Sequence, residues 1–382
     1  MKLKIEKKTT LILLILYFIT PFATSEENAY PIIKTPKNPL YGSYELKLRK
    51  DLIIGNESYD QYLFGSINGI EVNDRYMFVC DSKMVRIQVY DLKGRYVRTI
   101  GRKGNGPGEF LIPNTFCVSR NGNIYVHDVM RRRMIVFDQE GNHKRDITLE
   151  KILAGKFYVD ENGYIYSSIL EFESENDMYI YFIKMNPQGK LQNIFRKEFY
   201  LSPIFDTTSG NKMRIFYDHP YLANLYFTVT NGNTLVLMNS LVYELDFLSQ
   251  DGKVLMKIAK DEKSEKVSEE EKEGVFSDRF KDTPKSVLKN VTFSKQRPYS
   301  SNILTDETGR IYVERFKPVT EEDKGYSYDI FNKKGEYLYR SKIGFIANLI
   351  KNGYLYNISV KEEAGEIRII RYKIENWGEM RF

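Results

Sequence analysis

A recurring pair of turns, separated by short apolar stretches, constrains the fold of this chain more than any other feature of its sequence. Residues 115–142 show the unit most completely. Three strand-like stretches are joined by a tight Arg-Asn-Gly-Asn turn at 120–123 and a longer connection, and a second turn follows at 138–141. Gly provides the positive φ that such turns require, while Asn and Asp tolerate it. Each unit is therefore expected to form a small antiparallel sheet.

The same two turns return along the chain. The turn at 121–122, which we call the inner turn, recurs at Asn73-Asp74, Asn162-Gly163, Asn231-Gly232, Thr308-Gly309 and Asn352-Gly353. The outer turn, after the third stretch, recurs at Gly94, Gly141, Gly189, Gly252 and Gly335. Six inner turns and five outer turns indicate six units.

A single unit of this size cannot bury both faces of its sheet. Stacking such sheets around an axis covers the faces, and closing the ring protects the edges. We therefore predict an all-β six-bladed β-propeller with four-stranded antiparallel blades over residues 45–382. Residues 45–54 are expected to complete the last blade, because the final unit, 345–375, has no outer turn. A β-sandwich or a pair of barrels matches the strand count but not the repeated turns.

The first 25 residues differ in composition from the repeated units that follow. Residues 1–25 combine four lysines, an apolar run at 11–19 and small residues before position 25, which is typical of a secretory signal peptide. The apolar run is shorter than the roughly 20 residues of a membrane span. We expect export to the periplasm or cell envelope, with an extended segment at 26–44. The alternative is an uncleaved anchor, in which case the protein contacts the membrane.

The charge balance argues against nucleic acid as a partner. The whole chain has a net charge of +6 at pH 7. Without residues 1–25, 53 basic and 50 acidic side chains remain, a net charge of +3. A nearly balanced surface lacks the basic footprint of nucleic-acid-binding proteins.

The two cysteines, Cys80 and Cys117, lie in apolar strand-like stretches. An oxidising compartment permits a disulfide between them. The other interpretation, which the apolar surroundings favour, is a pair of buried free thiols.

Residues 100–138 resemble an NHL repeat. The resemblance rests on a glycine-rich linker, Gly101–Gly108, and on an Asp followed five residues later by Arg and by an apolar strand that ends in Asp. This motif occurs twice, as Asp81, Arg86 and Asp91 and as Asp128, Arg133 and Asp138. The later units keep the turns but not the motif, so the resemblance is to exported bacterial six-bladed propellers with degenerate NHL-like repeats. It implies the fold more than an activity.

Some enzymes with NHL-like propellers hold a metal in the central channel through His side chains from several blades. This chain has three histidines, His127, His143 and His219. His143 follows an outer turn and is expected far from the axis, which leaves too few for zinc, a metal that needs three or four ligands.

Lactonase-like six-bladed propellers bind calcium through carboxylates instead. The candidate metal ligands here are Glu71, Asp81, Asp128 and His127, which lie near inner strands or turns. Asp160 and Asp306 belong to inner turns, where Asp normally caps the turn. Calcium needs six to eight converging oxygens, and convergence is not visible in a sequence.

One further loop is a candidate binding site, and two neighbouring features are interpreted as structural. The Gly101–Gly108 stretch lacks the Gly-Lys-Ser/Thr ending of a phosphate-binding loop and is interpreted as a connection between blades. Arg131 and Arg132 lie in a loop and are candidates for an anionic ligand, the alternative being a solvated loop. Arg133 is interpreted as a structural partner of an Asp.

Two insertions are the predicted binding rim. Residues 259–290 are highly charged, with Glu and Lys at helical spacing, and predict a helix or loop between blades four and five. Residues 196–227 are rich in aromatics. Tyr217, His219 and Tyr221 are the candidates there for contact with a sugar or peptide. The charged insertion is a lid or partner-binding arm, or a solvated excursion.

No Ser-His-Asp signature, nucleophile elbow, Walker motif or zinc-finger spacing is present in the sequence. The leading hypothesis is a non-catalytic extracytoplasmic binding or scaffold protein without a cofactor, whose partner is a protein, peptide or glycan. The alternative is a calcium-dependent hydrolase or lyase of the lactonase or amidating-lyase type, with its site in the channel. A third hypothesis is a purely structural component of the cell envelope.

Overall fold

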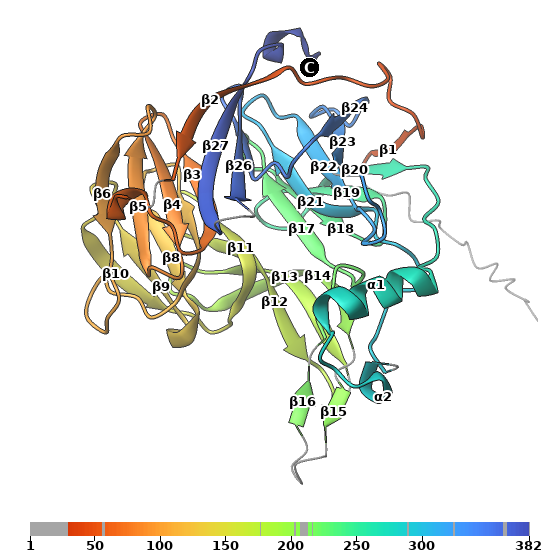
Figure 1. The fold of residues 1–382 in the computed structure, drawn as a ribbon, viewed down its shortest axis with the longest axis horizontal. Helices are drawn as coiled ribbons and strands as arrows, with labels where there is room; N and C mark the ends of the chain where they lie inside the picture. The colour runs from red at the N-terminus through yellow and green to blue at the C-terminus, as the bar shows by residue number, and fades with distance from the viewer. Residues whose placement is uncertain are drawn as a thin grey trace, which may run out of the picture.

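The computed structural model describes residues 30–55, 58–175, 177–201, 204–206, 213–215, 217–288, 290–323, 325–361 and 365–381. The predicted signal peptide, 1–25, lies outside the described residues. Within them, six blades of four antiparallel strands stand around a central axis (Figure 1), and β1 (Ile32–Thr35) adds a fifth strand to one of them. The prediction of an all-β six-bladed propeller is confirmed.

Each blade contains four strands, which are named below in order from the axis outward. Blade one has β3 (Ile67–Val72), β4 (Tyr76–Asp81), β5 (Arg86–Asp91) and β6 (Tyr96–Ile100); blade two has β7 (Pro113–Val118), β8 (Ile124–Asp128), β9 (Arg133–Phe137) and β10 (His143–Thr148). Blade three has β11 (Leu153–Val159), β12 (Ile165–Phe172), β13 (Met178–Met185) and β14 (Leu191–Leu201); blade four has β17 (Leu225–Val229), β18 (Leu235–Asn239), β19 (Glu244–Leu248) and β20 (Val254–Lys260). Blade five has β21 (Ser300–Thr305), β22 (Ile311–Arg315), β23 (Tyr326–Phe331) and β24 (Tyr337–Ile343); blade six has β25 (Leu349–Lys351), β26 (Tyr354–Lys361), β27 (Glu366–Ile374) and β2 (Leu48–Ile54).

The outer turns depend on glycine, as predicted. All five outer glycines have a positive φ, between 76° and 92°. The inner turn of blade four differs, because the left-handed residue there is Asn233, with φ of 60°, and not Gly232. Asn is among the few residues with a side chain that tolerate this conformation.

The N-terminal segment covers the outer edges of three successive blades. β2 pairs with β27, with Leu48 opposite Ile374, and completes blade six as predicted. The structure adds two pairings that the sequence did not predict. β1 (Ile32–Thr35) runs parallel to β20 at the edge of blade four, and the backbone N–H groups of Leu40 and Tyr44 donate to carbonyls of β24 in blade five. The unpaired edges of these blades are thereby covered.

The insertions have different bounds from those predicted. Because β14 extends to Leu201 and β17 begins at Leu225, the insertion after blade three is shorter than 196–227. It includes the two-stranded sheet of β15 (Ile204–Asp206) and β16 (Met213–Ile215). The predicted helical insertion between blades four and five is confirmed by α1 (Glu269–Arg279) and α2 (Lys285–Leu288).

Helix α1 begins with a capping box, in which Ser268 and Glu271 each accept a hydrogen bond from the other's backbone N–H. Single 3-10 turns occur at η1 (Asp60–Tyr62), η2 (Val129–Arg131) and η3 (Trp377–Glu379). None of the described helices has the length and apolar character needed to cross a membrane.

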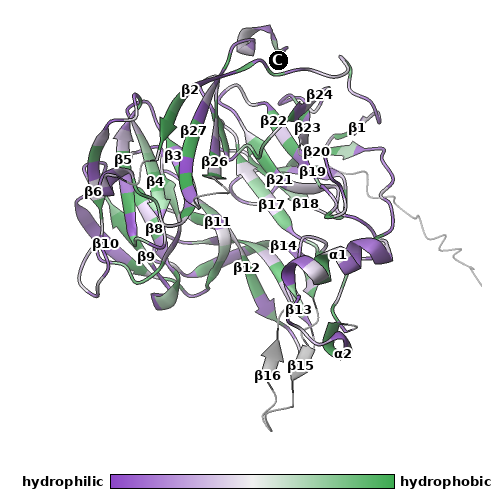
Figure 2. Ribbon diagram, in the orientation of Figure 1, coloured by the Kyte–Doolittle hydropathy of each residue, from purple (hydrophilic) through white to green (hydrophobic). Residues whose placement is uncertain are grey.

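The core consists of apolar layers between neighbouring blades. Figure 2 shows hydrophobic residues, in green, along the strands of the blades. Cys80 lies between blades one and two, and Cys117 lies between blades two and three. Both are buried free thiols, so of the two interpretations of the cysteines the structure supports the second.

Candidate functional site in the central channel

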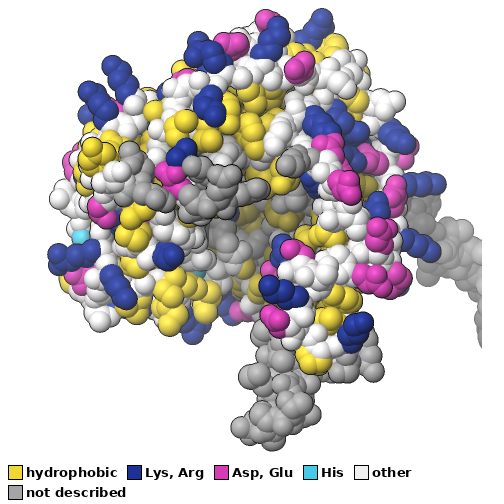
Figure 3. Space-filling view, in the orientation of Figure 1, with side chains coloured by type: hydrophobic (Ala, Val, Ile, Leu, Met, Phe, Trp, Pro, Cys, Tyr) yellow, Lys and Arg dark blue, Asp and Glu magenta, His cyan; other side chains and the backbone are white. Residues whose placement is uncertain are grey.

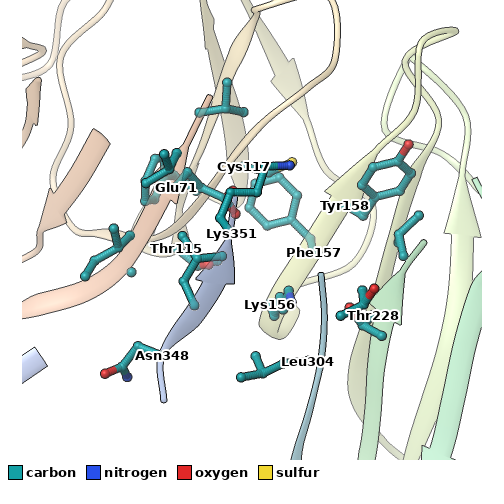
Figure 4. A pocket seen from close by; sticks show the side chains of 18 of the residues that line it. Glu71, Thr115, Cys117, Lys156, Phe157, Tyr158, Thr228, Leu304, Asn348 and Lys351 are labelled. Carbon is teal, nitrogen blue, oxygen red and sulfur yellow. The ribbon is translucent and has the colours of Figure 1, made fainter. Parts of the chain in front are cut away.

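The first strands of all six blades line a cavity of about 570 Å³ around the axis, shown in Figure 4. The lining strands are β3, β7, β11, β17, β21 and β25. This arrangement follows from the repeat, because the first strand of each unit is the innermost strand of its blade. Side chains from all six lining strands therefore reach the same space, although these residues are far apart in the sequence.

A β-bulge recurs where several of these strands enter the channel. The pairing register shifts between Ile67 and Gly69 in β3, and between Pro113 and Thr115 in β7. A bulge bends its strand and changes the direction of the side chain at the extra residue. The extra residues here are Asn68 and Asn114. Both line the cavity, and the Asn68 amide donates to the Asn114 carbonyl at 3.0 Å.

Three charged side chains from different blades lie around the cavity. Glu71 comes from β3, Lys156 from β11 and Lys351 from β25, as Figure 4 shows. Burial raises the pKa of Glu71, and both lysines partly oppose this rise. Among the described residues, none of the three charged groups has an ion-pair or side-chain hydrogen-bond partner. The cavity is therefore lined by charged groups of blades one, three and six that make no described ion-pair contact.

The end of the channel with the inner turns is crossed by hydrogen bonds between blades. Arg120 of blade two donates to the carbonyls of Thr230 and Asn231 in blade four. The Asn231 amide donates to the Glu307 carbonyl in blade five. The Glu307 carboxylate in turn accepts from the Asn352 N–H of blade six at 2.8 Å. We call this set of contacts the turn bridge.

The structure does not bring the predicted metal ligands together. Glu71 lines the channel, whereas the carboxylates of Asp81 and Asp128 each accept two backbone N–H groups from the linker before their own blade. His127 is fully buried, and neither ring nitrogen has a hydrogen-bond partner among the described residues. In the described ranges, no three His, Cys, Asp or Glu side chains are placed to share a metal ion.

The positions of the other predicted residues follow from the blade geometry. His143 lies on β10, the outermost strand of blade two, and its ring contacts the Asp146 carboxylate at 2.8 Å. Asp160 and Asp306 cap their inner turns, where each accepts backbone N–H groups from within the turn. Arg133 contacts the Asp146 and Asp128 carboxylates, in agreement with its structural interpretation.

The predicted anion-binding pair lies away from the cavity. Arg131 ends η2, and Arg132 follows in the left-handed conformation with φ of 50°. The Arg132 guanidinium donates to the Glu150 carbonyl. Neither arginine lines the channel, so no described contact links them to the site.

The aromatic candidates on the insertion after blade three pack against the insertion with α1. The His219 ring stacks on Phe293 with ring centres 4.1 Å apart, and the Tyr217 ring contacts Phe280 edge-on. The Tyr221 hydroxyl donates to the buried Glu271 carboxylate at 2.9 Å. His219 and Tyr221 are buried, so these two rings hold the insertions together and are not presented to a ligand.

A second cavity, of about 290 Å³, lies beside the insertion with α1. Its arginines are already paired: Arg315 with Glu262, and Arg297 with Glu265 and Glu271. Figure 3 shows basic and acidic side chains interspersed on this face. Because both of its arginines are paired and its volume is smaller, this cavity is a weaker candidate site than the channel.

Sequence reasoning identified Glu71 but missed Lys156, Lys351 and Arg120. The sequence could have identified two of these residues, because Lys351 and Arg120 directly adjoin the inner turns of their blades. A charged residue at the end of a first strand or in its turn is placed at the axis by the propeller geometry. The strand register that makes Lys156 face the cavity depends on a bulge, which the sequence does not reveal.

Comparison with known proteins confirms the fold. A candidate exported protein of Bacteroides fragilis NCTC 9343 has a similar structure, with a TM-score of 0.54, 13% identity, and coverage of 90% of this chain and 99% of the other. Virginiamycin B lyase from Staphylococcus aureus is more distant, with a TM-score of 0.41, 11% identity, and coverage of 85% and 99%. No curated protein matches the sequence. The family model described as domain of unknown function DUF4934 matches residues 57–375, and the chain therefore belongs to that family.

Proposed function

We propose that this protein is an exported, non-catalytic binding propeller that takes a part of a protein, peptide or glycan into its central channel. The observation that carries the proposal is the cavity of about 570 Å³ with three unpaired charged side chains, Glu71, Lys156 and Lys351, among the described residues. Ligand sites in proteins commonly have volumes of roughly 300–1,000 Å³, and combine apolar walls with a few polar groups that set orientation. The volume lies within this range, and polar and apolar side chains line the cavity in similar proportion.

The cysteine of the lining is unsuited to nucleophilic catalysis. Cys117 lines the cavity, and burial raises the pKa of its thiol to about 12. The thiolate is the reactive form of cysteine, so a thiol with this pKa is inert near neutral pH. Cys117 also packs in the apolar layer between blades two and three, in agreement with a structural role.

The calcium-dependent alternative does not fit the side chains present. Calcium needs six to eight oxygens. The two aspartates expected to supply them are engaged with backbone N–H groups, and Glu71 has two lysines beside it. Elemental analysis of mature protein purified without chelators tests this directly. One tightly bound calcium per chain would favour the enzyme over the binding protein.

Binding is tested by isothermal titration of the mature chain, residues 26–382, against panels of short peptides and envelope glycans. The variant Asn114→Trp fills the mouth of the channel, since Asn114 lines the cavity. The control Lys190→Trp places the same bulk on an outer turn. We expect Asn114→Trp to abolish binding and Lys190→Trp to leave it unchanged. Equal binding by the two variants, or turnover of a bound compound, would contradict the proposal.

A further inference from the structure

One end of the channel is crossed by hydrogen bonds between blades, and the other end is formed by the β-bulges. At the inner-turn end, the turn bridge links blades two, four, five and six through Arg120, Asn231 and Glu307. Because Arg120 reaches blade four from blade two, past blade three, its guanidinium spans part of the opening. Asn68 and Asn114, at the bulges, are at the opposite end of their strands. A ligand is therefore expected to enter from the bulge end.

The charges of the lining are unevenly compensated. Arg120 lies 3.9 Å from the Glu161 carboxylate and also donates to carbonyls of blade four, and the Asp306 carboxylate is paired with Arg310 at 2.8 Å. The other charged groups of the described lining have no described ion-pair partner. They are the Glu71 carboxyl and the ammonium groups of Lys156 and Lys351. All three residues line the same cavity, and both lysines act electrostatically on the Glu71 carboxyl.

Two ammonium groups at one cavity, with a single carboxyl beside them, leave an excess of positive charge. Charge in a cleft with low-dielectric walls is screened less than charge on an open surface, and the field it produces is concentrated. An anion that replaces water there gains a charge-assisted hydrogen bond from each ammonium. Because burial disfavours the ionised form of Glu71, this carboxyl opposes an incoming anion less than a solvated glutamate does.

We infer that the channel recognises an anionic head group, a carboxylate or a phosphate, on a small ligand or chain end, with Lys156 and Lys351 as the residues that bind it. The inference rests on the proposed function, since it names the chemistry recognised at the same cavity. The Asn68 and Asn114 amides at the bulge end then contact the neutral part of the ligand. A cationic ligand is disfavoured because Glu71 is the single acidic group without a partner among the described lining residues.

The test compares glucuronate, glucose 6-phosphate and inorganic phosphate with neutral glucose, by isothermal titration against the mature chain. We expect at least one of the anionic probes to bind at least about tenfold more tightly than glucose, a difference of roughly one charged hydrogen bond. Raising the salt concentration is expected to weaken that binding, because charges that ligands can reach are screened by salt. The carboxylate and phosphate probes distinguish the two sources of the anionic group.

Variants assign the binding to the two lysines. Lys156→Gln and Lys351→Gln are each expected to weaken binding by about tenfold, because each removes a charged hydrogen bond. Lys156→Arg and Lys351→Arg keep the charge and are expected to retain most of the affinity. Lys190→Gln, on an outer turn, is the matched control and is expected to bind like the wild type.

The outcomes separate this inference from the proposed function. If glucose binds as tightly as the anionic probes, or if the lysine variants bind normally while Asn114→Trp does not, the channel is a binding site but not an anion site. If no anionic probe binds at millimolar concentration, the inference is also overturned. If Asn114→Trp leaves the binding of an anionic probe unchanged, the channel is not the binding site and both proposals fail.

Discussion

Asp81 and Asp128 make equivalent contacts with the linkers of consecutive blades, although they lie on different sheets. Each carboxylate accepts two successive backbone N–H groups of the linker that leads into its own blade, at 2.9 to 3.1 Å. The donors are Gly65 and Ser66 for Asp81, and Leu111 and Ile112 for Asp128. Arg86 and Arg133 donate to carbonyls of the same linkers. The Asp-to-Arg motif therefore fastens each linker to its blade, and this explains its spacing.

Replacing Asp128 with alanine tests this role. The change removes the acceptor of two partly buried N–H groups, so we expect the free energy of unfolding to fall by about 2 kcal/mol. Chemical denaturation of the purified variant measures it. Glu140→Ala, on an exposed outer turn, is the control and is expected to change stability by less than about 0.5 kcal/mol. A loss below about 1 kcal/mol for Asp128→Ala would show that the linker does not depend on this carboxylate.

His127 predicts a dependence of stability on pH. Burial lowers the pKa of its imidazole from 6.5 to about 4, against a small opposing effect of Asp128. Between these values the unfolded chain binds a proton that the folded chain does not, so stability is lost as the pH falls from about 6.5 towards about 4. Relative to pH 7, we expect a loss of about 1–2 kcal/mol at about pH 5 from this residue.

The variant His127→Met isolates that contribution. Because neither ring nitrogen has a partner among the described residues, an apolar side chain of similar volume should be tolerated at neutral pH. Denaturation curves at neutral pH and at about pH 5 should differ less for the variant than for the wild type. An equal pH dependence for the two proteins would mean that His127 does not titrate on unfolding.

Asp329 is the centre of a buried charge network between blades four and five. Its carboxylate contacts the charged groups of Lys260 at 2.9 Å, Arg315 at 3.0 Å and Arg340 at 2.7 Å, and it also accepts from the hydroxyls of Tyr243 and Tyr337. Burial alone would raise the pKa of Asp329, but Arg340, Lys260 and Arg315 hold it below its usual range. The network stabilises the fold only while Asp329 is ionised.

For Asp329→Asn we expect a loss of about 3 kcal/mol in the free energy of unfolding. Arg340 loses its described carboxylate partner, and Lys260 and Arg315 are left with Glu262 as their described counter-ion. The ionised carboxylate stabilises the fold fully above the unfolded pKa of about 3.9, and this stabilisation decreases as the pH falls below that value. The loss caused by the variant should therefore shrink in acid. Asp323→Asn, which breaks an exposed pair with Lys342, is the control and should cost less than about 1 kcal/mol.

The N-terminal segment is predicted to prevent association through blade edges. A chain that begins at residue 45 lacks β1 and the pairing of residues 40–44 with β24, which exposes the edges of blades four and five. Unpaired edges pair with other chains. We expect a loss of about 2 kcal/mol from the missing hydrogen bonds, and association that increases with protein concentration. Light scattering after gel filtration measures this, with a chain that begins at residue 30 as the control.

The Tyr221 hydroxyl connects α1 to the insertion after blade three. It donates to Glu271 in α1 and accepts from the Val319 N–H. Tyr221→Phe removes both bonds and keeps the ring, so we expect faster hydrogen exchange in residues 269–279 with little change in global stability. Unchanged exchange in α1 would show that ring packing alone holds the helix.

The sequence was sufficient to predict the architecture because the repeat encodes it locally. Gly and Asn at the turns set strand lengths, and the number of repeats determined the number of blades. The Asp-to-Arg motif was visible for the same reason, since its two members lie five residues apart. The closure by residues 45–54 was also predictable, because the last unit lacks an outer turn and this segment alternates.

The site, in contrast, was decided by the tertiary structure. Glu71, Lys156 and Lys351 come from three blades and meet only because the ring closes. The positions of Asp81 and Asp128 beside inner strands suggested ligands, but the paths of the linkers determined that their carboxylates bind backbone N–H groups. The burial of Tyr221 against α1 likewise depends on how two insertions pack. Local sequence sets the turns and strands of each blade, whereas the direction of a side chain across the axis depends on bulges and on contacts between distant segments.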